Sequence, residues 1–156
     1  MFLSFTLPLL LHLSTFPTHT HSDGTVTKNY LSGQEQPFVV EFEVEVQSGT
    51  FSFFVDVVPN WAPVAARRFR DLVKERFYDN TRIHSVIPGF MVQFGISPNP
   101  KSNRRWSTRG MHDEINVRVS NTRGRITFAK TEKPHSRRFQ LFINCGDNER
   151  LDKQGK

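Results

Sequence analysis

The stretch RIHSVIPGFMVQFG, residues 82–95, holds two short apolar segments separated by a Pro-Gly pair. Apolar and aromatic residues on both sides of such a pair predict a strand, a break and a second strand. Because side chains alternate along a strand, Ser85 is expected to share a face with Ile83, whereas Arg82 lies on the opposite face. The serine needs an explanation, because its neighbours have the character of pocket-lining residues.

Further strands are expected on both sides of this stretch. In FVVEFEVEV, residues 38–46, apolar residues alternate with glutamates, which is the period of a strand with one face in water. After the turn-forming QSG, the segment TFSFFVDV, residues 50–57, repeats the alternation. RGRITFAK, residues 123–130, and RRFQLFIN, residues 137–144, predict two more β segments. The chain therefore has five or six predicted strands.

One amphipathic helix is expected among these strands. In PNWAPVAARRFRDLVKERF, residues 59–77, apolar residues recur at helical spacing, arginines occupy the other side, and Pro63 suits the first turn. By contrast, NPKSNRRWSTRGMHDEINVRVSN, residues 99–121, has no sustained period and predicts a long surface loop. The expected architecture is a mainly β sheet or barrel with a helical cap.

The composition indicates one folded domain with a basic surface. The chain has 156 residues, 37% of them hydrophobic, and its 15 phenylalanines suit a folded core and exclude a disordered chain. A net charge of +6 favours acidic partners, but no motif with stacked aromatics accompanies the arginines, so nucleic-acid binding is not expected. Cys145 is the only cysteine, which excludes an intrachain disulfide and a cysteine-rich metal site.

The N-terminal residues have the character of a targeting segment. An apolar run at residues 2–13 has the length of a signal-peptide core and is too short for a membrane-spanning helix. We therefore expect a signal peptide over residues 1–21, a polar linker over residues 22–36, and the folded domain over residues 37–156. This organisation predicts that the protein is located in the secretory pathway or the extracellular space. If the leader is not a signal peptide, a cytoplasmic location is expected.

Three segments together resemble cyclophilins, the cyclosporin-binding class of peptidyl-prolyl cis-trans isomerases. They are IHSVIPGFMVQFG, SNTRGRITFAKTEKPHSRRFQLFINCGDNERLD and APVAARRFRDLV, matching in order and spacing from about Phe38 to Asp152. The resemblance implies an antiparallel β-barrel with capping helices and an outer groove for a proline-containing peptide. The implied function is rotation of X-Pro bonds in peptides and unfolded protein clients, which is otherwise slow.

Partners and ligands follow from the same resemblance. We expect a monomer that needs no cofactor and no metal. Cyclosporin is an implied ligand, although Arg150 stands where many relatives have an aromatic residue.

The resemblance also places the family's pocket on individual residues. It implies that the substrate-binding residues are Phe90, Met91, Ala129, Lys130, Phe142 and Leu151. In this scheme Phe142 packs on the proline ring and the backbone of residues 129–130 pairs with the peptide. The implied catalytic positions are Ser85, Gln93 and Gln140. A prolyl ring needs such an apolar socket with a few polar groups that orient the peptide backbone.

Ser85 stands where the resemblance implies an arginine. In the family that cation bonds the carbonyl of the proline and favours the twisted amide over either planar isomer. A serine offers one short neutral hydroxyl instead of five donors, and Arg82 lies on the wrong face to replace the arginine. We expect strongly reduced activity, because one preorganised donor is typically worth about 2.7–4 kcal/mol.

The C-terminal segment LDKQGK, residues 151–156, comes before parts that the resemblance implies. Relatives continue into another strand, a second helix and a last strand that closes the barrel. The expected barrel is therefore incomplete, and residues 38–46 are expected to form an exposed edge. Three functions stay open: an isomerase of reduced activity, a proline-peptide-binding module with weak catalysis, and a non-functional truncated product.

Overall fold

The computed structural model describes residues 36–114 and 119–153. The elements in chain order are β1 (Phe38–Val46), β2 (Gly49–Val57), η1 (Pro59–Trp61), α1 (Pro63–Lys74), β3 (Ser85–Ile87), β4 (Met91–Phe94), α2 (Pro100–Ser107), β5 (Ile126–Phe128), β6 (Leu141–Asn144) and η2 (Glu149–Lys153). The predicted mainly β class is confirmed. Each predicted strand, and the predicted amphipathic helix, coincides with or overlaps an observed element.

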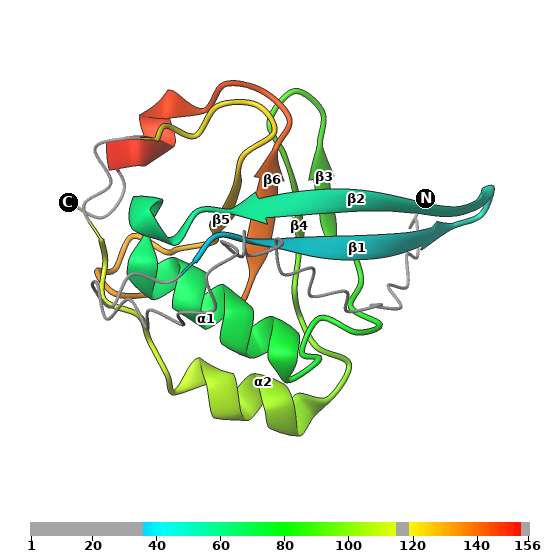
Figure 1. Ribbon diagram of the computed structural model, residues 1–156, viewed down its shortest axis with the longest axis horizontal. Helices are drawn as coiled ribbons and strands as arrows, with labels where there is room; N and C mark the ends of the chain where they lie inside the picture. The colour runs from blue at the N-terminus through cyan, green and yellow to red at the C-terminus, as the bar shows by residue number, and fades with distance from the viewer. Residues whose placement is uncertain (1–35, 115–118, 154–156) are drawn as a thin grey trace, which may run out of the picture.

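The strands form two antiparallel sheets. β1 and β2 make a long hairpin in which Phe38 faces Val57 and Val46 faces Gly49. The other four strands form a sheet in the order β3-β4-β6-β5. The hairpin lies across this sheet with α1 beside it, and its turn projects past the other described elements (Figure 1). The described strands do not join into one closed barrel, which agrees with the incomplete barrel expected from the sequence.

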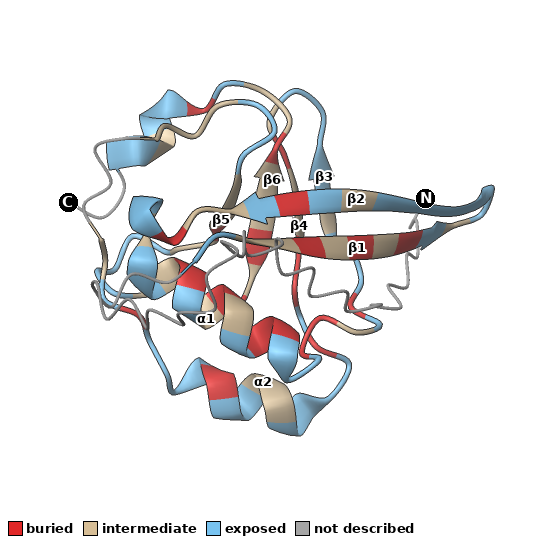
Figure 2. Ribbon diagram, viewed as in Figure 1, coloured by how far each residue is buried: buried red, intermediate tan, exposed pale blue. Residues whose placement is uncertain are grey.

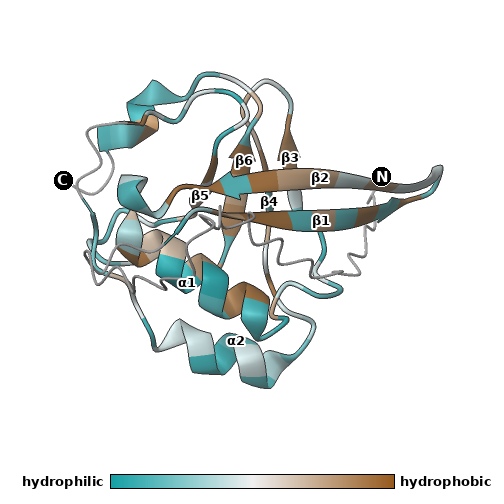
Figure 3. Cartoon of the chain, in the orientation of Figure 1, coloured by the Kyte–Doolittle hydropathy of each residue, from teal (hydrophilic) through white to brown (hydrophobic). Residues whose placement is uncertain are grey.

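The alternation in β1 decides which face of the hairpin is buried. Val40, Phe42 and Val44 are buried, whereas the glutamates between them are more exposed. Figure 2 shows this pattern along β1, and Figure 3 shows the matching change between hydrophobic and hydrophilic residues. The hairpin therefore presents one apolar face to the rest of the molecule, as the sequence predicts.

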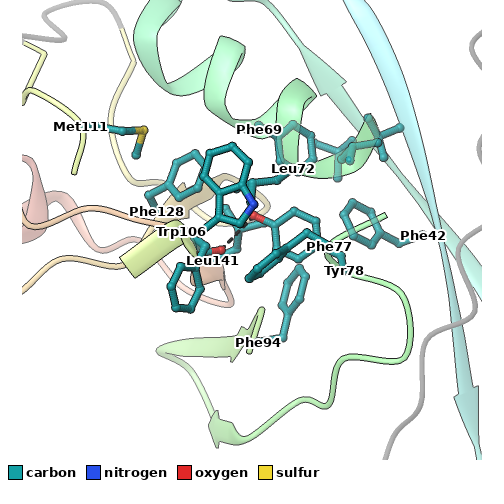
Figure 4. Close-up of a cluster of buried hydrophobic side chains, with 14 of the residues drawn as sticks. Phe42, Phe69, Leu72, Phe77, Tyr78, Phe94, Trp106, Met111, Phe128 and Leu141 are labelled. Atoms are coloured by element: carbon teal, nitrogen blue, oxygen red, sulfur yellow. Dashed lines mark hydrogen bonds between the residues drawn. The ribbon is translucent and has the colours of Figure 1, made fainter. Parts of the chain in front are cut away.

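Aromatic rings join the hairpin, α1 and the four-stranded sheet (Figure 4). The Phe42 ring centroid lies 5.2 Å from that of Phe53 on β2, 6.1 Å from Phe69 on α1 and 5.7 Å from Phe94 on β4. Tyr78 packs against Phe42 and donates its hydroxyl hydrogen to the Phe139 carbonyl oxygen at 2.8 Å. Such pairs stabilise a core beyond the area they bury. The core therefore supports the four-stranded sheet from its inner face.

A carboxylate from a distant loop caps the N-terminus of α1. The N-cap residue, Ala62, provides no side-chain hydrogen bond. The Glu114 carboxylate provides the cap instead. Its Oε1 accepts from the Val64 backbone N–H at 2.7 Å, and its Oε2 accepts from the Ala65 backbone N–H at 2.8 Å. A negative charge at this end of a helix also interacts favourably with the helix dipole.

Replacing this carboxylate is expected to destabilise the protein. Glu114→Ala leaves two helix N–H groups without their side-chain acceptor, so the free energy of unfolding should fall by about 0.5–2 kcal/mol. Urea unfolding followed by circular dichroism measures the change. Glu132→Ala, at an exposed position, removes the same charge as a control. Equal losses in the two variants would contradict the capping role.

The prediction of an irregular loop over residues 99–121 is wrong at its N-terminal end. Residues 100–107 form α2, in which the Asn99 side chain accepts from the Lys101 backbone N–H at 3.0 Å and Pro100 takes the first helical position. A helix of eight residues is too short to show a sustained apolar period, and its one buried residue is Trp106. The Asn-Pro pair was the available signal for its start.

Some expectations concern residues that the structure does not describe. The expected signal peptide and nearly all of the expected linker fall in residues 1–35, outside the described residues. Within residues 36–114 and 119–153, no helix is both long and apolar enough to cross a bilayer. In the same part of the chain, no three histidine, cysteine or acidic residues are grouped so that they could hold a metal ion.

Candidate peptide-binding site

Four residues stand in one row across the four-stranded sheet. Ser85 on β3 faces Gln93 on β4, and Gln93 faces Phe142 on β6. Phe142 in turn faces Thr127 on β5. Cross-strand partners share a face of the sheet, and Leu141, the neighbour of Phe142, points to the core on the other face. The register therefore places three predicted site residues together on the outer face of the sheet.

A cavity of about 230 Å³ lies on this face. Seven of the residues placed from the resemblance line it, namely Phe90, Met91, Gln93, Ala129, Lys130, Phe142 and Leu151. Most of these side chains are apolar, and aromatic, methionine and leucine groups provide a socket into which a prolyl ring can pack. The fold thus brings together predicted site residues from four separate segments of the chain. The individual roles of these residues remain predictions.

The two glutamines of the site hydrogen-bond to each other. The Gln93 side-chain amide donates from Nε2 to Oε1 of Gln140 at 2.8 Å. Gln140 is further positioned by its backbone, because its carbonyl oxygen accepts from the Ala129 N–H at 2.8 Å. Since the Gln140 side-chain oxygen is the acceptor in this pair, its amide nitrogen does not take part in the pairing and can donate to another acceptor.

The Pro-Gly turn that carries Phe90 is a tight turn, and the loop after β6 packs closely against it. The Phe90 N–H donates to the Ile87 carbonyl oxygen at 3.0 Å, and Gly89 has a φ of 71°, which favours glycine. A Cβ added to Gly146 would lie 2.2 Å from the Gly89 carbonyl oxygen. The close approach of these two glycines brings the loop after β6 against the turn.

Buried asparagines hold the same loop in place. The Phe90 carbonyl oxygen accepts from the Asn148 Nδ2 at 2.9 Å, and this amide also donates to the Asn144 Oδ1 at 2.8 Å. The Leu151 N–H donates to the Asn148 carbonyl oxygen at 2.8 Å. Asn144 and Asn148 are almost completely buried, where unpaired amides would be costly. The network therefore ties Phe90 and Leu151, two walls of the cavity, to one rigid segment.

A buried carboxylate organises the charged side of the cavity. Asp113 Oδ2 accepts from Lys130 Nζ and from the His135 backbone N–H, both at 3.0 Å, and Oδ1 accepts from Arg137 Nη1. Burial by itself would raise the pKa of the Asp113 carboxyl. These hydrogen bonds and the charges of Arg137 and Lys130 outweigh burial and lower the pKa below its ordinary value. Asp113 is therefore ionised at neutral pH.

Comparison with known proteins identifies the family. The family model for cyclophilin type peptidyl-prolyl cis-trans isomerase/CLD matches residues 39–155. The chain is 39% identical to peptidyl-prolyl cis-trans isomerase B of Escherichia coli (strain K12) over 95 residues, which cover 61% of this chain and 57% of that protein. It is 34% identical over 110 residues to a peptidyl-prolyl cis-trans isomerase of Acinetobacter baylyi (strain ATCC 33305 / BD413 / ADP1), covering 70% of this chain and 57% of that protein.

The chain belongs to the cyclophilin family. A crystal structure of a Cryptosporidium parvum cyclophilin type isomerase, in the presence of the dipeptide Ala-Pro, matches with a TM-score of 0.55 and 25% identity. That match covers 74% of this chain and 72% of the other. The cyclophilin described here spans 57% of the length of the two curated relatives named above.

Of the three predicted catalytic residues, only Gln93 lines the cavity of this cyclophilin. Gln140 is hydrogen-bonded to Gln93, and Ser85 faces Gln93 across the strands. Ser85 is half-buried and Arg82 is exposed, which agrees with the opposite faces expected for them. Where the resemblance implies a long cation, this cyclophilin has a short neutral hydroxyl.

The sequence prediction missed some residues of the cyclophilin cavity. Asn121, Thr127, Phe128 and Arg137 also line it. The Arg137–Arg138 pair was a sign of positive charge, but no periodic pattern connects Arg137 with Asp113, which lies far from it in the sequence. A larger cavity of about 350 Å³ lies between β2, the start of α1 and β5, and does not include the glutamine pair.

Proposed function

We propose that this cyclophilin binds proline-containing peptides and isomerises their X-Pro bonds at a low rate. The observation that carries the proposal is the outer cavity, where Met91, Phe142 and Leu151 form an apolar socket next to Gln93. The names of the relatives support the proposal, because both curated relatives are named peptidyl-prolyl cis-trans isomerases. The Ala-Pro dipeptide named with the Cryptosporidium parvum protein supports a proline-containing ligand.

The chemistry consists of rotating one amide bond. Resonance in the amide creates a barrier of roughly 18–20 kcal/mol, so a catalyst must bind the twisted amide better than either planar form. Phe142 and Leu151 would hold the prolyl ring. The amide nitrogen of Gln140 would donate to a carbonyl oxygen of the peptide and thereby restrict the rotating segment. No covalent bond forms or breaks in this scheme.

A protease-coupled isomerisation assay tests the proposal. The protein should accelerate cis-to-trans conversion of a chromogenic Ala-Pro peptide above the uncatalysed rate. Phe142→Ala should abolish the acceleration, because the prolyl ring loses its aromatic contact. Phe54→Ala, on the exposed side of β2, serves as the matched control. A wild-type rate equal to the uncatalysed rate would overturn the catalytic part of the proposal.

A second candidate function is binding with negligible catalysis, and Ser85 is the observation that favours it. Isothermal titration with the same peptide separates the two candidates, because measurable binding without rate acceleration identifies a proline-peptide-binding module. Absence of both binding and acceleration would contradict both candidates and favour a non-functional product.

Partners and location complete the proposal. The clients would be proline-containing segments of unfolded proteins, bound by a monomer without nucleic acid. Cyclosporin would bind weakly, because Arg150, which lies over the Phe90 ring, stands where the resemblance implies an aromatic residue. Residues 1–21 would direct the chain to the secretory pathway. Titration with cyclosporin tests the expected weak binding of that ligand. N-terminal sequencing of secreted protein tests whether residues 1–21 are a signal peptide.

A further inference from the structure

The charged residues that line the cavity are both basic. Among the described lining residues these are Lys130 and Arg137. The Lys130 side chain is 4% exposed and that of Arg137 is 23% exposed, so their charges are only partly screened by water. Both cations pair with Asp113, and this one carboxylate carries a single negative charge against their two positive charges. The wall built from these three residues is therefore positive.

A further cation lies beside the cavity, against the lining residue Phe90. The Arg150 guanidinium stands over the Phe90 ring, and the residue itself is exposed to solvent. Asp152 follows nearby in η2, where it accepts hydrogen bonds from Ser120 and Asn121. Glu149 and Asp152 belong to the same short helix, but neither lines the cavity. The described lining residues therefore include two cations, Lys130 and Arg137, and no carboxylate.

We infer that this cavity selects proline-containing peptides that carry an acidic residue within two positions of the proline. The inference rests on the proposed function and narrows its substrate class. A peptide carboxylate near Lys130 and Arg137 would be attracted by their two positive charges, which the single charge of Asp113 does not balance. A basic residue at the same peptide position would meet repulsion, which adds to the selectivity.

Peptide pairs that differ in one charge test the inference. A blocked Ala-Ala-Pro-Phe peptide is compared with versions carrying Glu, Gln or Lys at each of the two positions before the proline and at the position after it. At low salt, the Glu peptide should bind about three- to tenfold more tightly than its Gln counterpart at one or more of these positions. The Lys peptide should bind most weakly, and the preference should shrink as salt is raised.

Two variants assign the preference to the proposed residues. Arg137→Gln and Arg150→Gln each remove one positive charge at the cavity, and each should reduce the preference for Glu over Gln. Arg104→Gln removes the same charge from an exposed position on α2 and should leave the preference unchanged. Thermal unfolding of all three variants checks that the fold is retained. If Arg137→Gln does not fold, the preference for Glu over Gln measured in Arg150→Gln alone tests the inference.

The outcomes separate this inference from the proposed function. Equal binding of the Glu and Gln peptides at low salt would overturn the selectivity and leave proline-peptide binding intact. A preference that persists equally in both cavity variants would also overturn it, because the residues named here would not be its cause. If none of the peptides binds, the proposed function fails and the inference fails with it.

Discussion

Ser85→Arg is expected to raise kcat/KM for proline isomerisation by about two to three decades. The reason is that one preorganised donor to a charge-developing group is typically worth about 2.7–4 kcal/mol in the transition state. Ser85 stands opposite Gln93, so an arginine extending from this position would share the outer face with the glutamine pair. Peptide affinity should change much less than the rate, because the new contact favours the twisted amide.

Two control substitutions make this result specific. Ser85→Lys supplies a cation without the planar fork of five donors, and an intermediate increase is expected from it. Ser52→Arg makes the same chemical change at an exposed position of β2 and should leave kcat/KM unchanged. A folded Ser85→Arg protein that binds the peptide but turns it over no faster than the wild type would show that the serine does not limit catalysis.

The strands were predictable because each depends on a local pattern with a simple physical cause. Val40, Phe42 and Val44 are buried because residues two apart point to the same side of a strand, and the glutamates between them then face outward. The turn between β3 and β4 followed in the same way from the Pro-Gly pair. The seven lining residues, by contrast, were found by resemblance, because no periodicity connects positions on four different segments.

The features that the sequence did not predict depend on contacts between distant positions. Glu114 caps α1 from a loop, and Asp113 pairs with Arg137, and neither contact leaves a regular spacing. α2 was missed for another reason, since two turns with one buried tryptophan, Trp106, do not produce a measurable period. Local sequence patterns thus predicted the strands. The positive charge of the cavity could be recognised only from the three-dimensional arrangement of its residues.

Phe42→Ala is expected to lower the free energy of unfolding by about 3–5 kcal/mol. Removing a fully buried aromatic side chain loses its transfer energy and leaves a cavity that the surroundings fill only in part. Phe42 contacts rings from β2, α1 and β4, so three elements lose a partner at once. Phe54→Ala, on the same hairpin but 65% exposed, should change the free energy by no more than about 0.5 kcal/mol.

The same substitution should weaken the peptide-binding site without touching it. Phe94, which packs edge-on against Phe42, is the strand neighbour of Gln93 on β4. Loss of the Phe42 ring removes support beneath the strand that positions this glutamine, so peptide affinity should fall even where the variant remains folded. Urea unfolding and peptide titration at a temperature well below the transition measure the two effects separately. Unchanged affinity in a destabilised Phe42→Ala protein would show that the sheet holds the site without the hairpin.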